Sequence, residues 1–325
     1  MRSDMLVSVA VVDEEGPHIT IPRLAVVARA LEQNFRYFEL IYLLRESQRP
    51  QLDRFAAEIA GLANLRIILT GEGTRFYRQR LIATMEAIGD VVALYDPDDM
   101  PIEDLVTQIG HAKDRDEILI GWRPSRPPSG WSYRLLSLAS NNVISARAAR
   151  TIILPREPLN AIAARKSASI DLRFEARNAP THYNRFDITT PVRAKAGFSQ
   201  RYELLMEILL AGAPRFLKLY AALGFLVVAG STLYSFYAIA VILLRDHVQE
   251  GWFSTAIIQS GSTAFIAGGM SILAISLVAV LEVLSGGSAR MIVDEISNTN
   301  FFDKVEDLNV EMSGDTPAIG EQHVA

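Results

Sequence analysis

The chain has no cysteine among its 325 residues, which excludes disulfide bonds, thiolate nucleophiles and cysteine-ligated zinc sites. It has no long basic run and its formal net charge is −5, so we expect no nucleic-acid partner. Its five histidines lack HExxH or similar ligand spacing, and they therefore give no indication of a histidine metal site. A small molecule or a lipid is the expected class of partner.

Motifs of several common enzyme classes are also missing. The sequence contains neither GxGxxG nor GxxxxGK[ST], which argues against a dinucleotide oxidoreductase and against a P-loop NTPase. It has no GxSxG nucleophile elbow, which argues against an α/β-hydrolase.

Charge is absent from two long stretches near the C-terminus. Half of the chain is hydrophobic and its mean hydropathy is +0.18. Residues 219–244 and 253–281 contain no charged side chain, and each stretch exceeds the about 20 residues that a helix needs to cross a bilayer. Because the segment between them is short, we predict an antiparallel hairpin of two transmembrane helices, with the lipid bilayer as a partner.

Basic residues cluster before the first apolar stretch. They are Arg193, Lys195, Arg201, Arg215 and Lys218, whereas the connecting segment has only Arg245. The positive-inside rule then predicts that the N-terminal domain and the tail 285–325 lie in the cytoplasm. The expected location is the inner (cytoplasmic) membrane, as a multi-pass protein. The polar end of this tail is expected to be disordered.

Residues 201–218 have the pattern of an amphipathic helix. Leu204, Leu205, Ile208 and Leu209 share one helical face. We expect an interfacial helix that lies on the membrane surface. A helix packed on the soluble domain is an alternative that the pattern leaves open.

Residues 1–200 form the expected N-terminal domain, and residues 5–122 of it alternate between strand and helix patterns. The predicted strands are 5–12, 38–44, 65–70, 90–95 and 117–122, and the predicted helices are 21–34, 51–63, 76–89 and 102–114. This order predicts a doubly wound α/β domain with a mostly parallel sheet. In such sheets the ligand site lies at the carboxyl ends of the strands.

The fourth predicted strand runs directly into the sequence YDPDDMP, residues 95–101. Asp96 and Asp98 at this strand end are suited to hold a hard divalent cation that bridges them to a diphosphate. The alternative is an ordinary acidic turn, because Pro101 is suited to begin a helix whose first turn carries acidic residues. Asp99 is expected to serve the turn itself.

Four features in this order resemble the family-2 glycosyltransferases of GT-A fold, specifically the membrane-anchored polyprenyl-phosphate glycosyltransferases such as dolichyl-phosphate mannose synthases. They are VVDEEG (11–16), GDVVALYDPDD (89–99), RAKAGFSQRYELL (193–205) and the two apolar stretches. The resemblance implies a GT-A domain and homo-oligomers. It also implies metal-assisted, inverting transfer of a sugar from a nucleotide-diphosphate sugar to a polyprenyl phosphate, with Mg²⁺ or Mn²⁺ as cofactor, for cell-surface glycan synthesis.

The resemblance also implies roles for individual residues. It places Glu14 and Glu15 near the donor nucleotide. It places Asp96 at the donor diphosphate, makes Asp96 and Asp98 the metal ligands, and makes Asp98 the catalytic member of the pair.

One element departs from the family pattern. The family's second strand ends in two aspartates followed by Gly-Ser, whereas this chain has Leu44, Arg45, Glu46 and Ser47 there. Asp13 or Glu46 is the expected substitute as a donor-binding acid. The departure favours an alternative function, a catalytically impaired GT-A-like subunit or scaffold of a membrane complex.

A polyprenyl phosphate is anionic at neutral pH, so as an acceptor it needs cations more than a general base. The candidate acceptor-phosphate residues are Arg123, Arg126, Arg134, Arg193, Lys195 and Arg201. The alternative is that the juxtamembrane members only satisfy the positive-inside rule.

Overall fold

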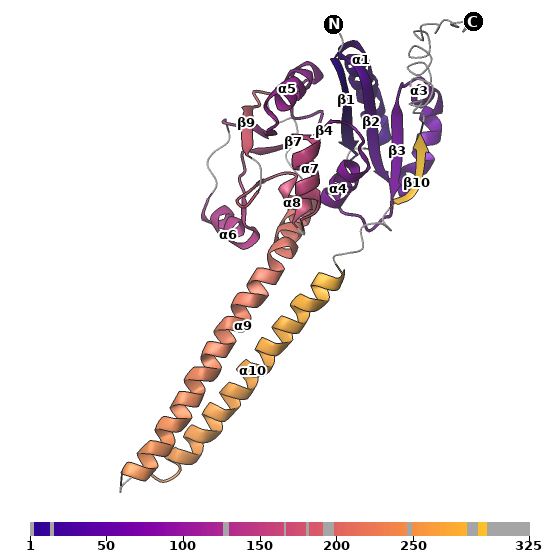
Figure 1. Cartoon of the computed structure of the whole chain (residues 1–325). Coiled ribbons are helices and arrows are strands. Elements are labelled where there is room, and N and C mark those ends of the chain that lie inside the picture. The colour runs from indigo at the N-terminus through magenta and orange to yellow at the C-terminus, as the bar shows by residue number, and fades with distance from the viewer. Residues whose placement is uncertain are drawn as a thin grey trace, which may run out of the picture.

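The computed structural model shows an α/β domain that carries a hairpin of two long helices (Figure 1). It describes residues 3–13, 16–125, 130–165, 167–179, 182–190, 198–245, 249–284 and 292–297. The α/β class with a mostly parallel sheet and a C-terminal pair of apolar helices is confirmed.

The domain is built on an eight-stranded sheet with the order β10-β3-β2-β1-β4-β7-β5-β9. Its strands are β1 (Ser3–Val12), β2 (Phe35–Arg45), β3 (Leu65–Thr70), β4 (Val91–Leu94), β5 (Ile118–Trp122), β7 (Ala148–Pro155), β9 (Tyr183–Asp187) and β10 (Ile292–Ser297). Strands β1 to β4 are parallel, whereas β7 is antiparallel to both β4 and β5, and β10 is antiparallel to β3. A separate two-stranded sheet pairs β6 (Asn142–Val143) with β8 (Glu175–Ala176).

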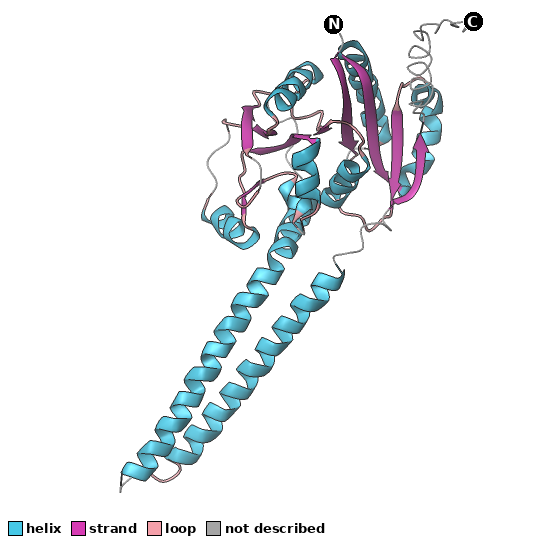
Figure 2. Cartoon of the chain, in the orientation of Figure 1, coloured by secondary structure: helices cyan, strands magenta, loops and turns pink. Residues whose placement is uncertain are grey.

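Helices flank the sheet, as Figure 2 shows. They are α1 (Pro17–Asn34), α2 (Arg49–Leu52), α3 (Ala56–Ala60), α4 (Phe76–Glu86), α5 (Ile102–Arg115), α6 (Trp131–Ser140), α7 (Arg156–Ala163) and α8 (Ala168–Asp171). Alternate residues of β1 enter different cores. Val7, Val9 and Val11 pack in the cluster that includes α1 and α5, whereas Ala10 packs in the cluster that includes α4 and α7. This period of two is what a strand buried on both faces requires.

Three features of the structure differ from the prediction. The helix expected over 51–63 breaks into α2, a 3₁₀ turn and α3. Strand β7 was not predicted, and it separates β5 from β4. The tail expected over 285–325 contributes β10 to the sheet. The expected disorder of its end falls on residues outside the described ones.

The expected interfacial helix over 201–218 is not a separate element. Residues Phe198–Leu244 form one helix, α9, which continues through Pro214. Its first turns pack on the α/β domain, where Glu207 and Ile208 are buried. Ser169 donates a hydrogen bond to Glu207 (2.7 Å), and Arg75 pairs with the same carboxylate at 3.5 Å. These first turns therefore pack on the domain, and contact of the same helix with a membrane surface, which such packing does not exclude, stays a prediction.

Helix α9 lies alongside α10 (Trp252–Leu284) in an antiparallel hairpin (Figure 1). Both helices are long and apolar enough to cross a membrane, and only 6% and 17% of their most apolar windows are buried. The helices approach closely at Gly224, where a Cβ would lie 2.0 Å from the Ser271 hydroxyl oxygen. The hydroxyls of Ser235 and Ser260 share a hydrogen bond of 2.7 Å across the hairpin. Small and hydroxyl side chains at the contact are typical of helix pairs in membranes.

Strand β10 returns the chain from α10 to the edge of the sheet. Besides its ladder with β3, Arg66 pairs with Glu295 at 2.8 Å and Arg49 pairs with Asp294 at 2.9 Å. Both ends of the hairpin are therefore joined to one domain. If the hairpin spans a bilayer, those ends lie on the same side of it.

Because the chain has no cysteine of its own, paired substitutions report the hairpin contact directly. We expect the double variant Ser235→Cys/Ser260→Cys to form an intramolecular disulfide under mild oxidation, since the two native hydroxyl oxygens are in contact. The matched pair Thr232→Cys/Ser260→Cys starts from an exposed side chain of the same helix and should stay reduced. Equal cross-linking of both pairs on a non-reducing gel would contradict the packing.

Candidate donor-binding pocket

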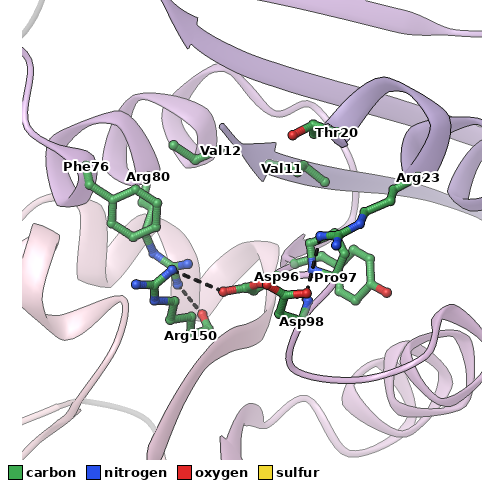
Figure 3. A pocket seen from close by; sticks show the side chains of 12 residues that line it. Val11, Val12, Thr20, Arg23, Phe76, Arg80, Asp96, Pro97, Asp98 and Arg150 are labelled. Carbon is green, nitrogen blue, oxygen red and sulfur yellow. Dashed lines mark hydrogen bonds and ion pairs between the residues drawn. The ribbon is translucent and has the colours of Figure 1, made fainter. Parts of the chain in front are cut away.

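A pocket of about 530 Å³, including its open mouth, lies at the carboxyl ends of β1 and β4. Its lining residues are Ala10, Val11, Val12, Thr20, Arg23, Phe76, Arg80, Tyr95, Asp96, Pro97, Asp98 and Arg150 (Figure 3). They come from β1, α1, α4, the YDPDD turn and β7. The pocket is thus at the edge of the sheet where a doubly wound fold is expected to bind its ligand.

Asp99 holds the turn in place, although its carboxylate does not line the pocket. It is 4% exposed and accepts hydrogen bonds from the backbone N–H groups of Arg150 (2.7 Å) and Thr151 (2.8 Å) and from the Thr151 hydroxyl (3.0 Å). It also forms an ion pair with the buried Arg123 at 2.6 Å. A buried carboxylate is stable only when it is paired and hydrogen-bonded in this way. Asp99 therefore joins the turn after β4 to strand β7.

Asp96 and Asp98 each face an arginine across the pocket (Figure 3). Asp96 lies 3.4 Å from an Arg150 nitrogen, and Asp98 lies 3.2 Å from an Arg23 nitrogen. The second oxygen of Asp96 accepts the backbone N–H of Asp98 at 3.0 Å. This local bond fixes the turn so that the two side chains project from adjacent points of one wall.

Burial and the negative charge of Asp99 together raise the pKa of Asp96 to about 6, and Arg150 only partly offsets the increase. The Asp96 side chain is 19% exposed, so water screens part of this effect. Because the pKa of Asp96 is raised, ionising this carboxyl lowers the stability of the folded chain relative to the unfolded chain.

Arg80, Arg150 and Phe76 form the opposite wall. The guanidinium of Arg80 is buried and donates to the backbone carbonyls of Arg150 and Leu172, the latter at 3.0 Å. The guanidinium of Arg150 lies over the Phe76 ring, 5.1 Å from its centre. The ring and the carbonyls therefore hold two cations beside the carboxylate of Asp96.

The pocket is close to the base of the α9–α10 hairpin. Phe76 lines it, and the preceding residue, Arg75, forms the ion pair with Glu207 of α9. Strand β1 begins at the end of the domain away from the hairpin (Figure 1), so its carboxyl end points toward the hairpin. A ligand in this pocket would face the side of the domain that carries the hairpin.

Of the acids predicted for the donor site, the structure brings together Asp96 and Asp98. Asp13 is buried behind them and is used internally, because it accepts hydrogen bonds from Gly16 (2.9 Å), Thr20 (2.8 Å) and Gln48 (2.9 Å). Glu46 is exposed at the end of β2 and does not line the pocket.

The predicted acceptor-phosphate cations have different positions. Arg123 is buried in its pair with Asp99 and donates to the Thr190 carbonyl at 2.8 Å, so it is committed to the fold. Arg134 and Arg201 are exposed on α6 and α9, two helices that pack against each other. Five predicted site residues fall outside the described part of the chain: Glu14, Glu15, Arg126, Arg193 and Lys195.

The sequence reasoning missed the basic side of the pocket. Arg23 and Arg80 lie inside segments that were correctly predicted to be helical, but helical periodicity does not reveal that they face a ligand site. Arg150 was missed because its strand, β7, was not predicted. The sequence signal for β7 was the short run TIILP (151–155), which contains β-branched and apolar residues.

A divalent metal at Asp96 and Asp98 is what the resemblance implies, but the side chains as placed do not fit it. Both carboxylates face guanidinium groups, and one Asp96 oxygen is used by the turn. Mg²⁺ needs nearly octahedral oxygen ligands at about 2.0–2.1 Å. Within the described ranges, no group of three or more acidic or histidine side chains is arranged to hold a metal ion.

Comparisons with known proteins give structural likenesses only. No family model matches the chain, and no curated protein matches it. A mannosyltransferase from Pyrobaculum calidifontis, PcManGT, solved with GDP-Man and Mn²⁺, is 11% identical with a TM-score of 0.35, over 97% of this chain and 82% of that one. TarS residues 1–349 from S. aureus are 15% identical with a TM-score of 0.32, over 91% of this chain and 97% of that one. The TarS complex with UDP-GlcNAc is 14% identical with a TM-score of 0.32, over 85% and 84%.

Removing the Asp99 carboxylate should destabilise the domain, because Arg123 would be left buried without its partner. We expect Asp99→Ala to lower the melting temperature by about 10 °C, corresponding to the about 3–5 kcal/mol of a broken buried pair. The exposed Asp114→Ala is the matched control and should melt within about 2 °C of the wild type. Equal melting temperatures for the two variants would show that Asp99 does not hold the turn.

Asp96 should make stability depend on pH in a defined direction. Since its pKa is about 6 in the folded chain, against an ordinary value of 3.8, the folded chain holds a proton between these values that the unfolded chain has lost. Stability then falls as the pH rises through this window, and Asp96→Asn removes the loss. We expect Asp96→Asn to melt higher than the wild type above about pH 6 and to lose this advantage progressively as the pH falls from about 6 to below 3.8. Thermal melts that show a constant difference would contradict the raised pKa.

Proposed function

We propose that the protein is a membrane-bound glycosyltransferase that moves a sugar from a nucleotide-diphosphate sugar to a polyprenyl phosphate. The observation that carries the proposal is the pocket at the ends of β1 and β4, where acidic and basic side chains meet beside the base of an apolar hairpin. A charged pocket of this kind suits a diphosphate, and its position near the hairpin suits an acceptor that stays in the bilayer.

The proposed reaction is a single inverting displacement. A phosphate oxygen of the acceptor attacks the anomeric carbon, the bond from that carbon to the donor diphosphate breaks, and the nucleoside diphosphate leaves with the electron pair. The acceptor phosphate is already anionic, so no side chain has to remove a proton. The exposed Arg134 and Arg201 are the described candidates to hold that phosphate, because α6 and α9 adjoin the domain where the hairpin begins.

The membrane arrangement is part of the proposal. The domain and the strand that follows α10 would lie in the cytoplasm, and the two helices would cross the inner membrane, as the basic residues before α9 predict. The return of β10 to the sheet supports an even number of crossings. The homo-oligomer that the resemblance implies also belongs to the proposal.

The proposed transfer is compatible with a divalent metal ion or with none. A divalent cation at Asp96 and Asp98 would require the facing arginines to move away and Asp96 to be ionised. The glycosyl transfer itself requires only that the charge on the leaving diphosphate be neutralised.

A second candidate function is a GT-A-like subunit or scaffold without catalysis. The observation in its favour is the end of β2, where Leu44 is fully buried and Arg45 bonds through its backbone N–H to Gln48. Gln48 in turn donates a hydrogen bond to Asp13, one of the two acids predicted to substitute at this strand end. These contacts fill the place where the family's nucleoside-binding aspartates are expected.

Calorimetric titration of the full chain with UDP-, GDP- and dTDP-sugars, with and without Mg²⁺ or Mn²⁺, separates the two candidates. The glycosyltransferase proposal predicts that one of these donors binds and that Asp98→Ala weakens its affinity by about tenfold or more, since Asp98 positions Arg23. Asp114→Ala, an exposed acid outside the pocket, should bind like the wild type. If no donor binds under any of these conditions, the scaffold candidate replaces the enzyme.

A further inference from the structure

The lining of the pocket has more positively than negatively charged side chains. Arg23, Arg80 and Arg150 line it together with Asp96 and Asp98, so three guanidinium groups oppose two carboxylates. A diphosphate adds negative charge to this set, whereas a divalent cation adds positive charge beside three cations. The electrostatic balance of the lining therefore favours the anion over the metal.

The ion pairs in the pocket are loose. The distances of 3.2 Å for Arg23 with Asp98 and 3.4 Å for Arg150 with Asp96 exceed the about 2.7–2.9 Å of a strong charge-assisted hydrogen bond. Both arginines keep part of their surface exposed, 34% and 22% of the side chain respectively. Each carboxylate thus directs its guanidinium toward the pocket. A phosphate oxygen can form a shorter hydrogen bond to that guanidinium than the carboxylate does.

The backbone that carries Arg150 is held from two sides. Asp99 accepts its N–H and Arg80 donates to its carbonyl, while the Phe76 ring supports the guanidinium. A group held in this way loses little conformational entropy when it binds a ligand. A planar guanidinium group can also bind two phosphate oxygens at once, which suits a diphosphate site that has no metal ion.

Arg23 approaches from helix α1, whose N-terminal turn opens on the pocket at Thr20. Asp13 fixes this turn through Gly16 and Thr20. The positive end of the helix dipole therefore adds to the charge of Arg23 on the same side of the pocket.

We propose that Arg23 and Arg150 bind the donor diphosphate directly, with Arg80 holding Arg150 in place, so that donor binding needs no divalent metal. The inference rests on the proposed function for the identity of the ligand as a nucleotide-diphosphate sugar. In the transfer step the guanidinium groups neutralise the negative charge that develops on the leaving diphosphate oxygen as its bond to the anomeric carbon breaks. Asp96 and Asp98 then act as positioning residues for the two arginines.

The test is a calorimetric titration of the full chain with sugar nucleotides in EDTA and in Mn²⁺, and with inorganic pyrophosphate in EDTA. We expect equal donor affinity, within about twofold, in EDTA and in Mn²⁺. Arg150→Gln and Arg23→Gln should each weaken the binding of donor and pyrophosphate by about tenfold or more. Arg29→Gln, an exposed position on the same helix as Arg23, is the matched control and should leave both affinities unchanged. Thermal melts establish that each variant is folded.

The other outcomes distinguish the two proposals. Donor binding that occurs only with Mn²⁺ overturns the metal-free site and leaves the glycosyltransferase proposal standing. Arginine-dependent binding of pyrophosphate without binding of any sugar nucleotide supports the diphosphate site and overturns the glycosyltransferase proposal. Absence of both, or affinities that Arg150→Gln and Arg23→Gln do not change, overturns the arginine site.

Discussion

The buried pair of Asp99 with Arg123, together with the three hydrogen bonds from Arg150 and Thr151, is the interaction on which the pocket depends. It fixes the turn after β4 to a strand that is distant in sequence and antiparallel to it. The β4–β7 ladder brings the turn beside this strand, and the contact fixes the turn so that its acids face Arg150. Desolvation makes such a pair weak as a source of net stability, but losing one partner is costly, so the contact specifies geometry more than it adds free energy.

Further contacts around this pair hold the other residues of the pocket in place. Arg80 and Phe76 hold Arg150, Asp13 holds the start of α1, and α1 carries Arg23. The result is a site in which Arg23 and Arg150 each have an opposite charge nearby at a loose distance. We infer that a diphosphate can replace a carboxylate as the partner of each arginine at a small cost in free energy, because the guanidinium changes partners without moving from its place.

The sequence was sufficient for the parts of the fold that local patterns encode. Val-rich strands and amphipathic helices predicted the α/β class, and the rule for strand ends placed Asp96 and Asp98 in the pocket. Long-range pairing was not predictable from these patterns. Strand β7 inserts between β4 and β5, and β10 comes from a polar tail that pairs at the sheet edge. Arg150 and the role of Asp99 depend on the first of these pairings, so they could not be found without it. The continuity of α9 through Pro214 depends likewise on packing against the domain and α10.

Metal-free binding of the diphosphate by the two arginines is tested most directly by an experimental structure of the full chain with a nucleotide-diphosphate sugar bound in the presence of EDTA. We expect diphosphate oxygens within about 3 Å of guanidinium nitrogens of Arg23 and Arg150. We also expect Asp96 and Asp98 to remain beside these arginines. A diphosphate bound elsewhere on the domain, or one that is seen only when a metal ion sits between Asp96 and Asp98, would contradict metal-free binding by the arginines.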